Sequence, residues 1–135
     1  MVTSPGVLLR GAGLRPTSQR LAVLDVISKS EKSLTAQDVY ARLRRRAGAG
    51  LTTVYRTLAA LADAGILDTF EQSGEKSFRL CASEHHHHIV CVSCGSVEEI
   101  EGAEVEDWVK RLARNHHFEV ISHRADIYGR CRDCR

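Results

Sequence analysis

The sequence of 135 residues lacks any long apolar run, and its first 80 residues contain neither cysteine nor histidine. No stretch approaches the ~20 apolar residues of a membrane-spanning helix, and the first residues contain no apolar run as long as that of a secretory signal. Internal repeats and low-complexity tracts are missing too, apart from a run of histidines. We therefore expect a cytoplasmic globular protein with no membrane partner.

The composition is that of an ordinary globular chain, with 43% hydrophobic and 27% charged residues. Each half of so short a chain can bury little apolar core, because a domain of roughly 60 residues buries only about 60% of its unfolded surface. A chain that divides into two such halves needs metal, disulfides or a partner chain for stability.

Charge is distributed unevenly along the chain. Residues 1–66 carry ten Lys or Arg and four Asp or Glu, a net charge of +6, whereas residues 67–135 carry nine and thirteen, a net charge of −4. All seven histidines and all five cysteines lie in the second part. The first half therefore suits a polyanion and the second suits cations, although a solvated basic helix face explains the charge alone equally well.

The first half predicts three helices followed by a β-hairpin. The first helix begins after Pro16, with Thr17 or Ser18 as its cap. The second is capped by Thr35, has Asp38 at its third position and ends within residues 44–48. The third is capped by Thr52 and ends near Gly65. The alternation in ILDTFE, the turn residues QSGE and the run KSFRL predict the hairpin. This order is typical of a winged helix-turn-helix, and the alternative is a packing module without a nucleic-acid role.

The third predicted helix has two distinct faces. Val54 and Leu58 share an apolar side, whereas Arg56 points nearly opposite, close to the small side chain of Thr53. Small neighbours let a helix approach the major groove closely, where a guanidinium can bind a guanine edge. Tyr55 lies at the flank and can contact a thymine methyl group or a phosphate. This face is therefore the candidate DNA-binding surface.

Two C-x-x-C knuckles, Cys91–Cys94 and Cys131–Cys134, are the strongest single signal in the sequence. Four thiolates at this spacing can close a tetrahedral zinc site. In a reducing cytosol such pairs are metal ligands or redox groups more often than disulfides. Neither knuckle follows the strand-to-helix pattern of a redox motif, so we predict structural zinc.

The histidine run continues into the apolar sequence IVCV, which favours a strand. Successive side chains of a strand point to opposite faces, so His85 and His87 are expected on one face and His86 and His88 on the other. One run can therefore serve two metal sites. Its internal position argues against an expression tag.

Each histidine pair has candidate partners elsewhere in the chain. Cys81 and Asp68 can complete an Asp/Cys/His/His shell, of the kind that zinc accepts, at the site nearer the hairpin. A helix is expected over GAEVEDWVKRLARNHH and a strand over FEVISH. These elements carry Glu106 and His123, which can join the other pair in a shell of three imidazoles and one carboxylate.

Two other classes of function are alternatives for this sequence. A small zinc hydrolase would use an open His/Cys/Asp site with Glu84 as the base, but these ligand sets are four-coordinate and closed, whereas a catalytic site keeps one position open. A zinc-stabilised interaction module without DNA contacts is the second alternative. Loss of specific DNA binding on replacing Arg56 would argue against it.

The ordered set TSQR, TTVYRTLAAL, HHHHIVCVSCG and a terminal C-x-x-C resembles the ferric uptake regulator family, specifically its zinc uptake regulator branch. The similarity covers nearly the whole chain. It implies an α+β fold with an N-terminal winged helix-turn-helix domain, residues 1–82, and a small C-terminal α/β dimerisation domain with metal sites, residues 83–135. It also implies a homodimeric, Zn²⁺-dependent repressor of zinc-uptake genes that binds palindromic double-stranded DNA operators and has no small-molecule substrate.

The resemblance also assigns roles to individual residues. Tyr55 and Arg56 correspond to residues that meet bases, and Arg15 and Arg20 correspond to backbone contacts. Cys81 and the unbroken histidine run depart from the iron branch, and a thiolate favours zinc over Fe(II), with a sensor of iron, nickel, manganese or peroxide as the alternative. The implied metal sites are the structural site Cys91, Cys94, Cys131 and Cys134, the hinge site Asp68, Cys81, His86 and His88, and the further site His85, His87, Glu106 and His123.

Overall fold

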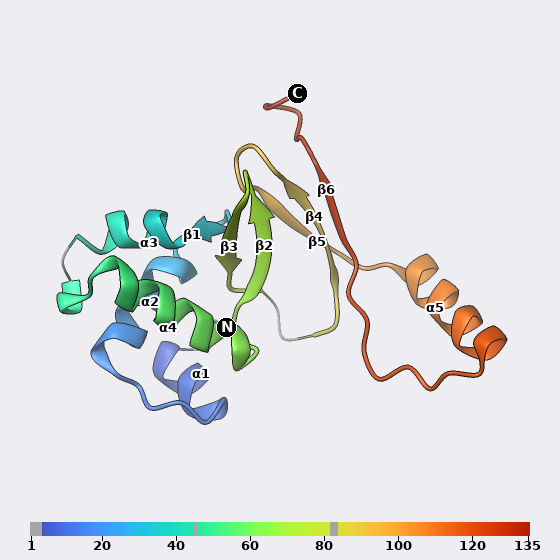
Figure 1. Ribbon diagram of the computed structural model, residues 1–135, viewed down its shortest axis with the longest axis horizontal. Helices are drawn as coiled ribbons and strands as arrows, with labels where there is room; N and C mark the ends of the chain where they lie inside the picture. The colour runs from blue at the N-terminus through green and yellow to red at the C-terminus, as the bar shows by residue number, and fades with distance from the viewer. Residues whose placement is uncertain (1–3, 45, 82–83) are drawn as a thin grey trace.

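The computed structural model describes residues 4–44, 46–81 and 84–135. The first half contains four α-helices, a short 3-10 turn and a three-stranded sheet in which β3 lies between β1 and β2 and is antiparallel to both (Figure 1). The elements are α1 (Pro5–Gly11), α2 (Ser18–Ser28), β1 (Leu34–Thr35), α3 (Ala36–Leu43), η1 (Arg46–Gly48), α4 (Leu51–Asp63), β2 (Asp68–Gln72) and β3 (Glu75–Arg79).

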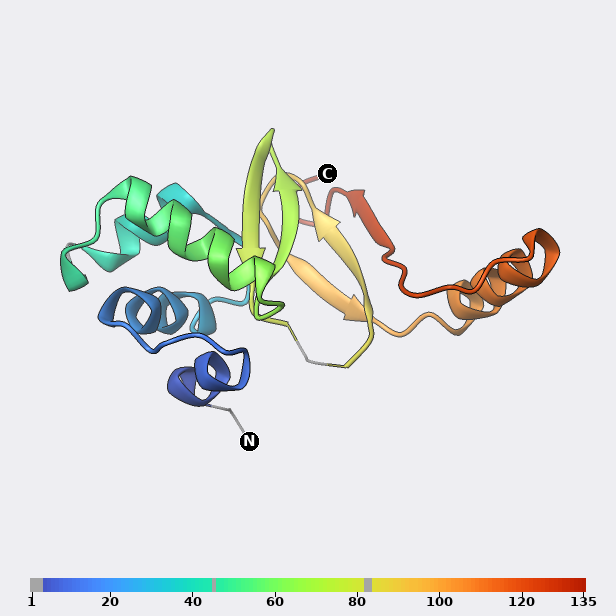
Figure 2. The ribbon, with the colours of Figure 1, turned by 60° about the horizontal axis from the view of Figure 1, so that its bottom comes forward.

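The second half contains β4 (His87–Cys91), β5 (Val97–Ile100), α5 (Ala103–His116) and β6 (Asp126–Gly129). β4 is the central strand, with β5 antiparallel on one side and β6 parallel on the other. α5 stands away from both sheets in the two views of the ribbon (Figures 1 and 2). A winged helix followed by a small α/β part confirms the predicted α+β fold class.

Local capping and turn signals position the helices and the wing as expected. Thr17 caps α2, and Thr35 and Asp38 form a complete capping box at the start of α3. The wing strands β2 and β3 are joined through Ser73 and Gly74, which both have positive φ (51° and 80°), as tight hairpin turns require. The predicted end of α3 includes Arg45, which lies outside the described residues.

The predicted cap of the third helix is wrong. α4 begins at Leu51, and the cap position before it is taken by Gly50, without a side-chain hydrogen bond. A cap residue needs an extended backbone, which Gly50 adopts (φ −83°, ψ 175°), and its carbonyl accepts a hydrogen bond from the Val54 amide at 3.0 Å. Thr52 is therefore already helical.

Two elements of the first half were not predicted from the sequence. The two-residue strand β1 is too short to show an alternating pattern. α1 is also short, but Ser4 caps it, Pro5 occupies its first turn, and Leu9 is completely buried in the core. Its stability therefore comes from tertiary packing rather than from a visible apolar period.

The predicted strand over residues 118–123 is absent: in the described chain no strand is assigned between α5 and β6. A strand needs a hydrogen-bonded neighbour, and alternating residue types do not supply one. In this segment Phe118 is 72% exposed and Ile121 is 96% exposed. The segment is thus apolar but uncovered.

The two halves meet through an apolar cluster and several polar contacts. Phe70 of the wing packs with Val90 and Val97 of the second sheet, and Cys81 adjoins them. Ser33 donates hydrogen bonds from its amide (2.8 Å) and its hydroxyl (3.1 Å) to the Gly95 carbonyl. The wing therefore rests on β4 and β5, which places the histidine run beside it.

The predicted domain boundary falls at residues 82 and 83, which lie outside the described residues. Among the described residues, no helix is both long and apolar enough to cross a membrane.

Candidate metal centres and nucleic-acid interface

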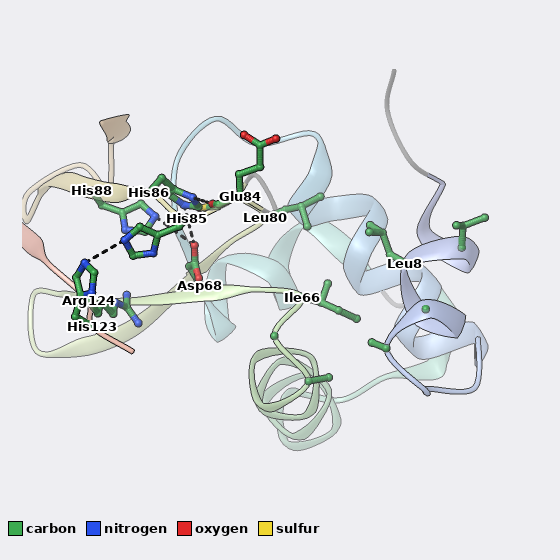
Figure 3. A pocket seen from close by; sticks show the side chains of 16 residues that line it. Leu8, Ile66, Asp68, Leu80, Glu84, His85, His86, His88, His123 and Arg124 are labelled. Carbon is green, nitrogen blue, oxygen red and sulfur yellow. Dashed lines mark hydrogen bonds and ion pairs between the residues drawn. The ribbon is translucent and has the colours of Figure 1, made fainter. Parts of the chain in front are cut away.

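The structure brings together the four residues predicted for the hinge site, here called the hinge cluster: Asp68, Cys81, His86 and His88. Their ligand atoms all lie within 4.8 Å of one another. Asp68 is the first residue of β2, and Cys81 follows β3. In the other half of the chain, His86 directly precedes β4 and His88 lies within it. Figure 3 shows Asp68 pointing from the wing toward His86 and His88.

Each of the two imidazoles of the hinge cluster directs into it a nitrogen that makes no hydrogen bond within the described chain. The Nε2 atoms of His86 and His88 are buried and make no hydrogen bond in the part of the chain that the structure describes. They lie 3.3 Å and 3.2 Å from an Asp68 carboxylate oxygen. Nδ1 of His86 faces the carbonyl of Glu84, and Nδ1 of His88 faces the carboxylate of Asp126 at 2.8 Å. Because these oxygens accept hydrogen bonds, each neutral ring carries its proton on Nδ1 and a lone pair on Nε2, as a cation requires.

Cys81 is half-buried, and burial raises the pKa of its thiol to about 12. The nearby Arg79 guanidinium, which donates to Sγ at 3.4 Å, lowers this pKa, whereas Asp68 raises it. The thiol is therefore protonated at neutral pH until a cation replaces the proton.

The acidic residue Glu99 lies beside the hinge cluster and was not predicted. An oxygen of Glu99, on β5, lies 3.3 Å from His86 Nε2. The antiparallel register pairs Glu99 with His88. The sequence held only a weak signal for this, the acidic residues in VEEIE, because their register against β4 was unknown.

A second group, here called the helix cluster, comprises His85, His87, Glu106 and His123. Nε2 of His87 lies 2.6 Å from a Glu106 oxygen, and Nε2 of His85 and of His123 each lie 3.0 Å from this carboxylate. Hydrogen bonds from His87, His123 and His85 lower the pKa of Glu106 to about 2. An ionised carboxylate among imidazoles suits a cation, and it ties α5 to the start of β4.

The contact between Glu106, in the first turn of α5, and His87 of β4 depends on Gly102. A Cβ at this position would lie 2.8 Å from Cδ2 of the buried His87 ring. Any larger residue would therefore displace the ring that contacts Glu106.

The four-cysteine cluster comprises Cys91, Cys94, Cys131 and Cys134, whose Sγ atoms lie within 4.8 Å of one another. β4 and β6 are parallel, so both strands end on the same side of the sheet, and the two knuckles that follow them meet there. All four are free thiols. Their number, type and separation match a closed tetrahedral zinc site.

The thiols of this cluster differ in acidity. Hydrogen bonds from the amides of Cys131 and Cys94 lower the pKa of Cys91 to about 6. The Cys131 amide lies 3.4 Å from Cys91 Sγ. The pKa of Cys134 is raised to about 12 by hydrogen bonding to its cysteine neighbours, Cys131 first. A cation would remove this conflict by accepting all four sulfurs as thiolates.

The predicted DNA-binding face of α4 is open to solvent. Thr53, Tyr55 and Arg56 are exposed, whereas Val54 and Leu58 are completely buried. Arg15 is exposed in the loop before α2. The guanidinium of Arg20 donates to the carbonyl of Arg15 at 2.9 Å, so Arg20 also stabilises this loop.

A cleft of about 590 Å³ lies beside the hinge cluster (Figure 3). Leu8 of α1, Ile66 and Leu80 form an apolar wall, and Asp68, His86 and His88 line the opposite side. Glu84, the base of the hydrolase alternative, is an exposed residue at this cleft. The cleft gives ions from solvent access to the hinge cluster.

The sequence matches the ferric uptake regulator family over residues 11–128. The zinc uptake regulation protein of Mycobacterium tuberculosis is 43% identical over 129 residues, which cover 94% of this chain and 99% of that protein. Because residues 11–128 include the wing, both histidine pairs and the first knuckle, the match does not rest on one motif.

Solved structures show the same fold. The ferric uptake regulator of Vibrio cholerae superposes with a TM-score of 0.73 at 33% identity, covering 93% of this chain and 98% of that one. FurB of M. tuberculosis, a zinc uptake regulator, superposes with a TM-score of 0.51 at 44% identity, covering 93% and 99%. Since sequence and structure agree over nearly the whole chain, it belongs to the ferric uptake regulator family, whose members are metal-responsive transcription regulators rather than enzymes.

Proposed function

We propose that this protein is a cytoplasmic, homodimeric, zinc-responsive repressor that binds palindromic operators of zinc-uptake genes. Family membership supports metal-responsive regulation, and the similarity to zinc uptake regulators of M. tuberculosis supports zinc as the metal. The basic first half supports DNA as the partner. The sites of the proposal are one structural zinc site, at the four-cysteine cluster, and one or two regulatory sites, at the hinge and helix clusters.

The hinge cluster is the observation that carries this proposal. Asp68 and Cys81 belong to the wing side, and His86 and His88 belong to the second half, so the four donors span the connection between the halves. The buried Nε2 atoms lack hydrogen bonds in the described chain, which fits a cation better than a closed polar network. A thiolate with two imidazoles favours zinc over harder divalent ions.

The chain's own contacts define what such a site would control. Contacts between the halves include the packing of Phe70 on Val90 and Val97 and the hydrogen bonds from Ser33 to Gly95. Zinc, when bound, would link four side chains that come from both halves. Asp68 and Cys81 would then hold the wing, and with it α4, in one orientation relative to the second sheet.

A second copy of the chain is the proposed cover for α5 and the segment after it. Trp108 and Leu112 on α5, and Phe118, Val120 and Ile121 after it, are all exposed apolar side chains. Exposed apolar side chains concentrated on one helix and the segment after it suit an interaction site. A twofold dimer would set two α4 helices about one DNA turn apart, roughly 34 Å, which matches a palindrome.

We propose that Arg56, Tyr55 and Thr53 read bases, with Arg15 and Arg20 at the DNA backbone. All except Arg20 are exposed. A sensor of iron, nickel, manganese or peroxide is the second candidate, because the V. cholerae relative is a ferric uptake regulator. The hydrolase alternative loses its support with membership of a regulator family.

The test is a metal titration of DNA affinity. Zinc-loaded protein would first select a duplex from a randomised pool, and chelator-treated protein would then be titrated on that duplex with buffered Zn²⁺, Fe²⁺, Mn²⁺ or Ni²⁺, monitored by fluorescence anisotropy. We expect Zn²⁺ to restore tight binding at the lowest free concentration. Equal or better activation by Fe²⁺ would overturn the choice of zinc.

Matched variants distinguish an effect specific to the hinge cluster from the effect of losing any histidine. Cys81→Ser and His86→Ala should need much higher free zinc for DNA binding, whereas His116→Ala, which removes an exposed histidine at the end of α5, should behave as wild type. Full DNA affinity of the zinc-stripped wild-type protein would overturn the proposed mechanism.

A further inference from the structure

We propose that Asp126 is a positioning residue of the hinge cluster, and that Arg124 links it to the wing. This inference rests on the proposed metal binding at the hinge cluster. It assigns a task to two residues that are not ligands. Asp126 contacts Nδ1 of the His88 ring, whereas Asp68 lies at Nε2.

The two nitrogens of the His88 ring have different partners. Nε2 points into the hinge cluster, 3.2 Å from an Asp68 oxygen, and Nδ1 lies 2.8 Å from Oδ1 of Asp126. The side chains of His88 and Asp126 are 4% and 12% exposed, so water competes little for this hydrogen bond. The parallel register of β4 and β6 pairs these two residues directly, which fixes the distance through the backbone.

Arg124 connects the same carboxylate to the wing. Its Nε donates to the second oxygen of Asp126 at 2.5 Å, and its Nη2 donates to the carbonyl of Thr69, the residue after Asp68. The guanidinium carbon also lies 5.4 Å from the centre of the Phe70 ring, within the range of a cation–π contact. One side chain therefore joins the carboxylate behind His88 to the strand that carries Asp68.

This arrangement has a direct chemical consequence for a metal ligand. A carboxylate that accepts the Nδ1 proton keeps the lone pair on Nε2, fixes the ring plane and makes the imidazole a stronger donor. His86 obtains the same support from the Glu84 carbonyl, a backbone group. Asp126 is a side chain, so its contribution can be removed without changing any ligand.

The experiment measures zinc affinity at the hinge cluster by competition with a chromophoric chelator, on protein whose four-cysteine cluster is already loaded. Asp126→Ala should weaken zinc binding about 10- to 100-fold, the usual effect of removing such a partner. Asp126→Asn keeps an acceptor without charge and should give a smaller loss. Glu119→Gln, a matched change at an exposed carboxylate, should give none.

A second measurement separates positioning from a merely structural role. Long-range ¹H–¹⁵N NMR of metal-free protein above neutral pH should show the His88 proton on Nδ1 in the wild type and substantially on Nε2 in Asp126→Ala. Arg124→Ala should weaken zinc binding by a smaller factor and leave this tautomer in place, because Asp126 is still present. If Asp126→Ala fails to fold by circular dichroism, Asp126→Asn carries the test.

The outcomes distinguish this inference from the proposed function. Wild-type affinity and tautomer in Asp126→Asn and Asp126→Ala, with binding still abolished in Cys81→Ser, would overturn the positioning role alone. Wild-type protein whose zinc binding is the same as that of Cys81→Ser would overturn the hinge site and this inference together.

Discussion

At the scale of single residues, the acidity of Cys81 links metal binding to pH. Its pKa is raised to about 12 by burial. Zinc binds the thiolate, so binding at the hinge cluster must release the Cys81 proton. Zinc binding at this cluster therefore depends on pH through its sulfur ligand.

We expect the apparent zinc association constant of the hinge cluster to rise about tenfold per pH unit between roughly pH 7.5 and 9. The rise follows because the folded-state pKa of Cys81 lies above this range, so the thiol stays protonated in the free protein throughout it. Competition with a chelator of known pH dependence measures the slope.

Cys81→Asp is the control for this prediction, because an aspartate carboxyl is ionised across the whole range. Its zinc affinity should be nearly independent of pH. An equally steep slope in Cys81→Asp would show that the proton comes from another group.

At the scale of elements, α4 divides its faces between core and DNA. Replacing Arg56 with Ala removes an exposed side chain, so stability should change little, but specific DNA binding should weaken by about 1–3 kcal/mol. Arg56→Lys keeps the charge but loses the forked donor geometry and should recover only part of the loss.

Arg114→Ala supplies the comparison for α4, since Arg114 is exposed on α5 in the other half. Anisotropy measurements on specific and scrambled duplexes should show no loss for this variant. Equal losses for Arg56→Ala and Arg114→Ala would mean that overall charge, rather than the α4 face, determines binding.

The segment after α5 forms part of the proposed interface between two copies of the chain. Ile121 is 96% exposed in the single chain, and in the proposed dimer it is covered. Ile121→Asp would place a charge in an apolar interface, so the dimer dissociation constant should increase at least about tenfold in sedimentation experiments. Val7→Asp changes an apolar residue of α1 that is 56% exposed and should leave the dimer intact.

At the scale of the whole molecule, Gly95 controls how closely the two halves meet. It has φ +79°, and a Cβ there would lie 2.9 Å from the carbonyl oxygen of Ser33 and 2.8 Å from the Gln72 side chain. Gly74, in the wing turn, has φ +80° but no atom within 4 Å of such a Cβ. The pair therefore separates backbone strain from contact between the halves.

Both Gly74→Ala and Gly95→Ala should lower the free energy of unfolding by about 1–2 kcal/mol, because alanine is strained in the left-handed backbone conformation. Gly95→Ala should lower the free energy of unfolding by roughly a further 1–3 kcal/mol. The added Cβ would contact the carbonyl oxygen of Ser33, a backbone atom that cannot rotate away as a side chain can. Urea denaturation measures both values. Equal losses in the two variants would mean that the contact between the halves contributes nothing to stability.

Prediction from the sequence worked best where the signal is local. The capping box of α3, the wing turn and the alternation that sends His85 and His87 away from His86 and His88 all depend on residues a few positions apart. Prediction failed where a local pattern had no neighbouring strand to pair with. Residues 118–123 alternate like a strand, but a strand forms only beside another strand, and the described single chain supplies none.

The sequence by itself determined the kinds of ligand, their spacing in each knuckle and the face that each histidine takes, because bond geometry relates neighbouring residues directly. Only the tertiary structure decided that Glu99 and Asp126 lie beside the hinge histidines, and that Ser33 meets Gly95. These contacts depend on the register of β4 with β5 and β6 and on the packing of the wing. That arrangement results from many weak contacts between distant segments, and no short stretch of sequence specifies it.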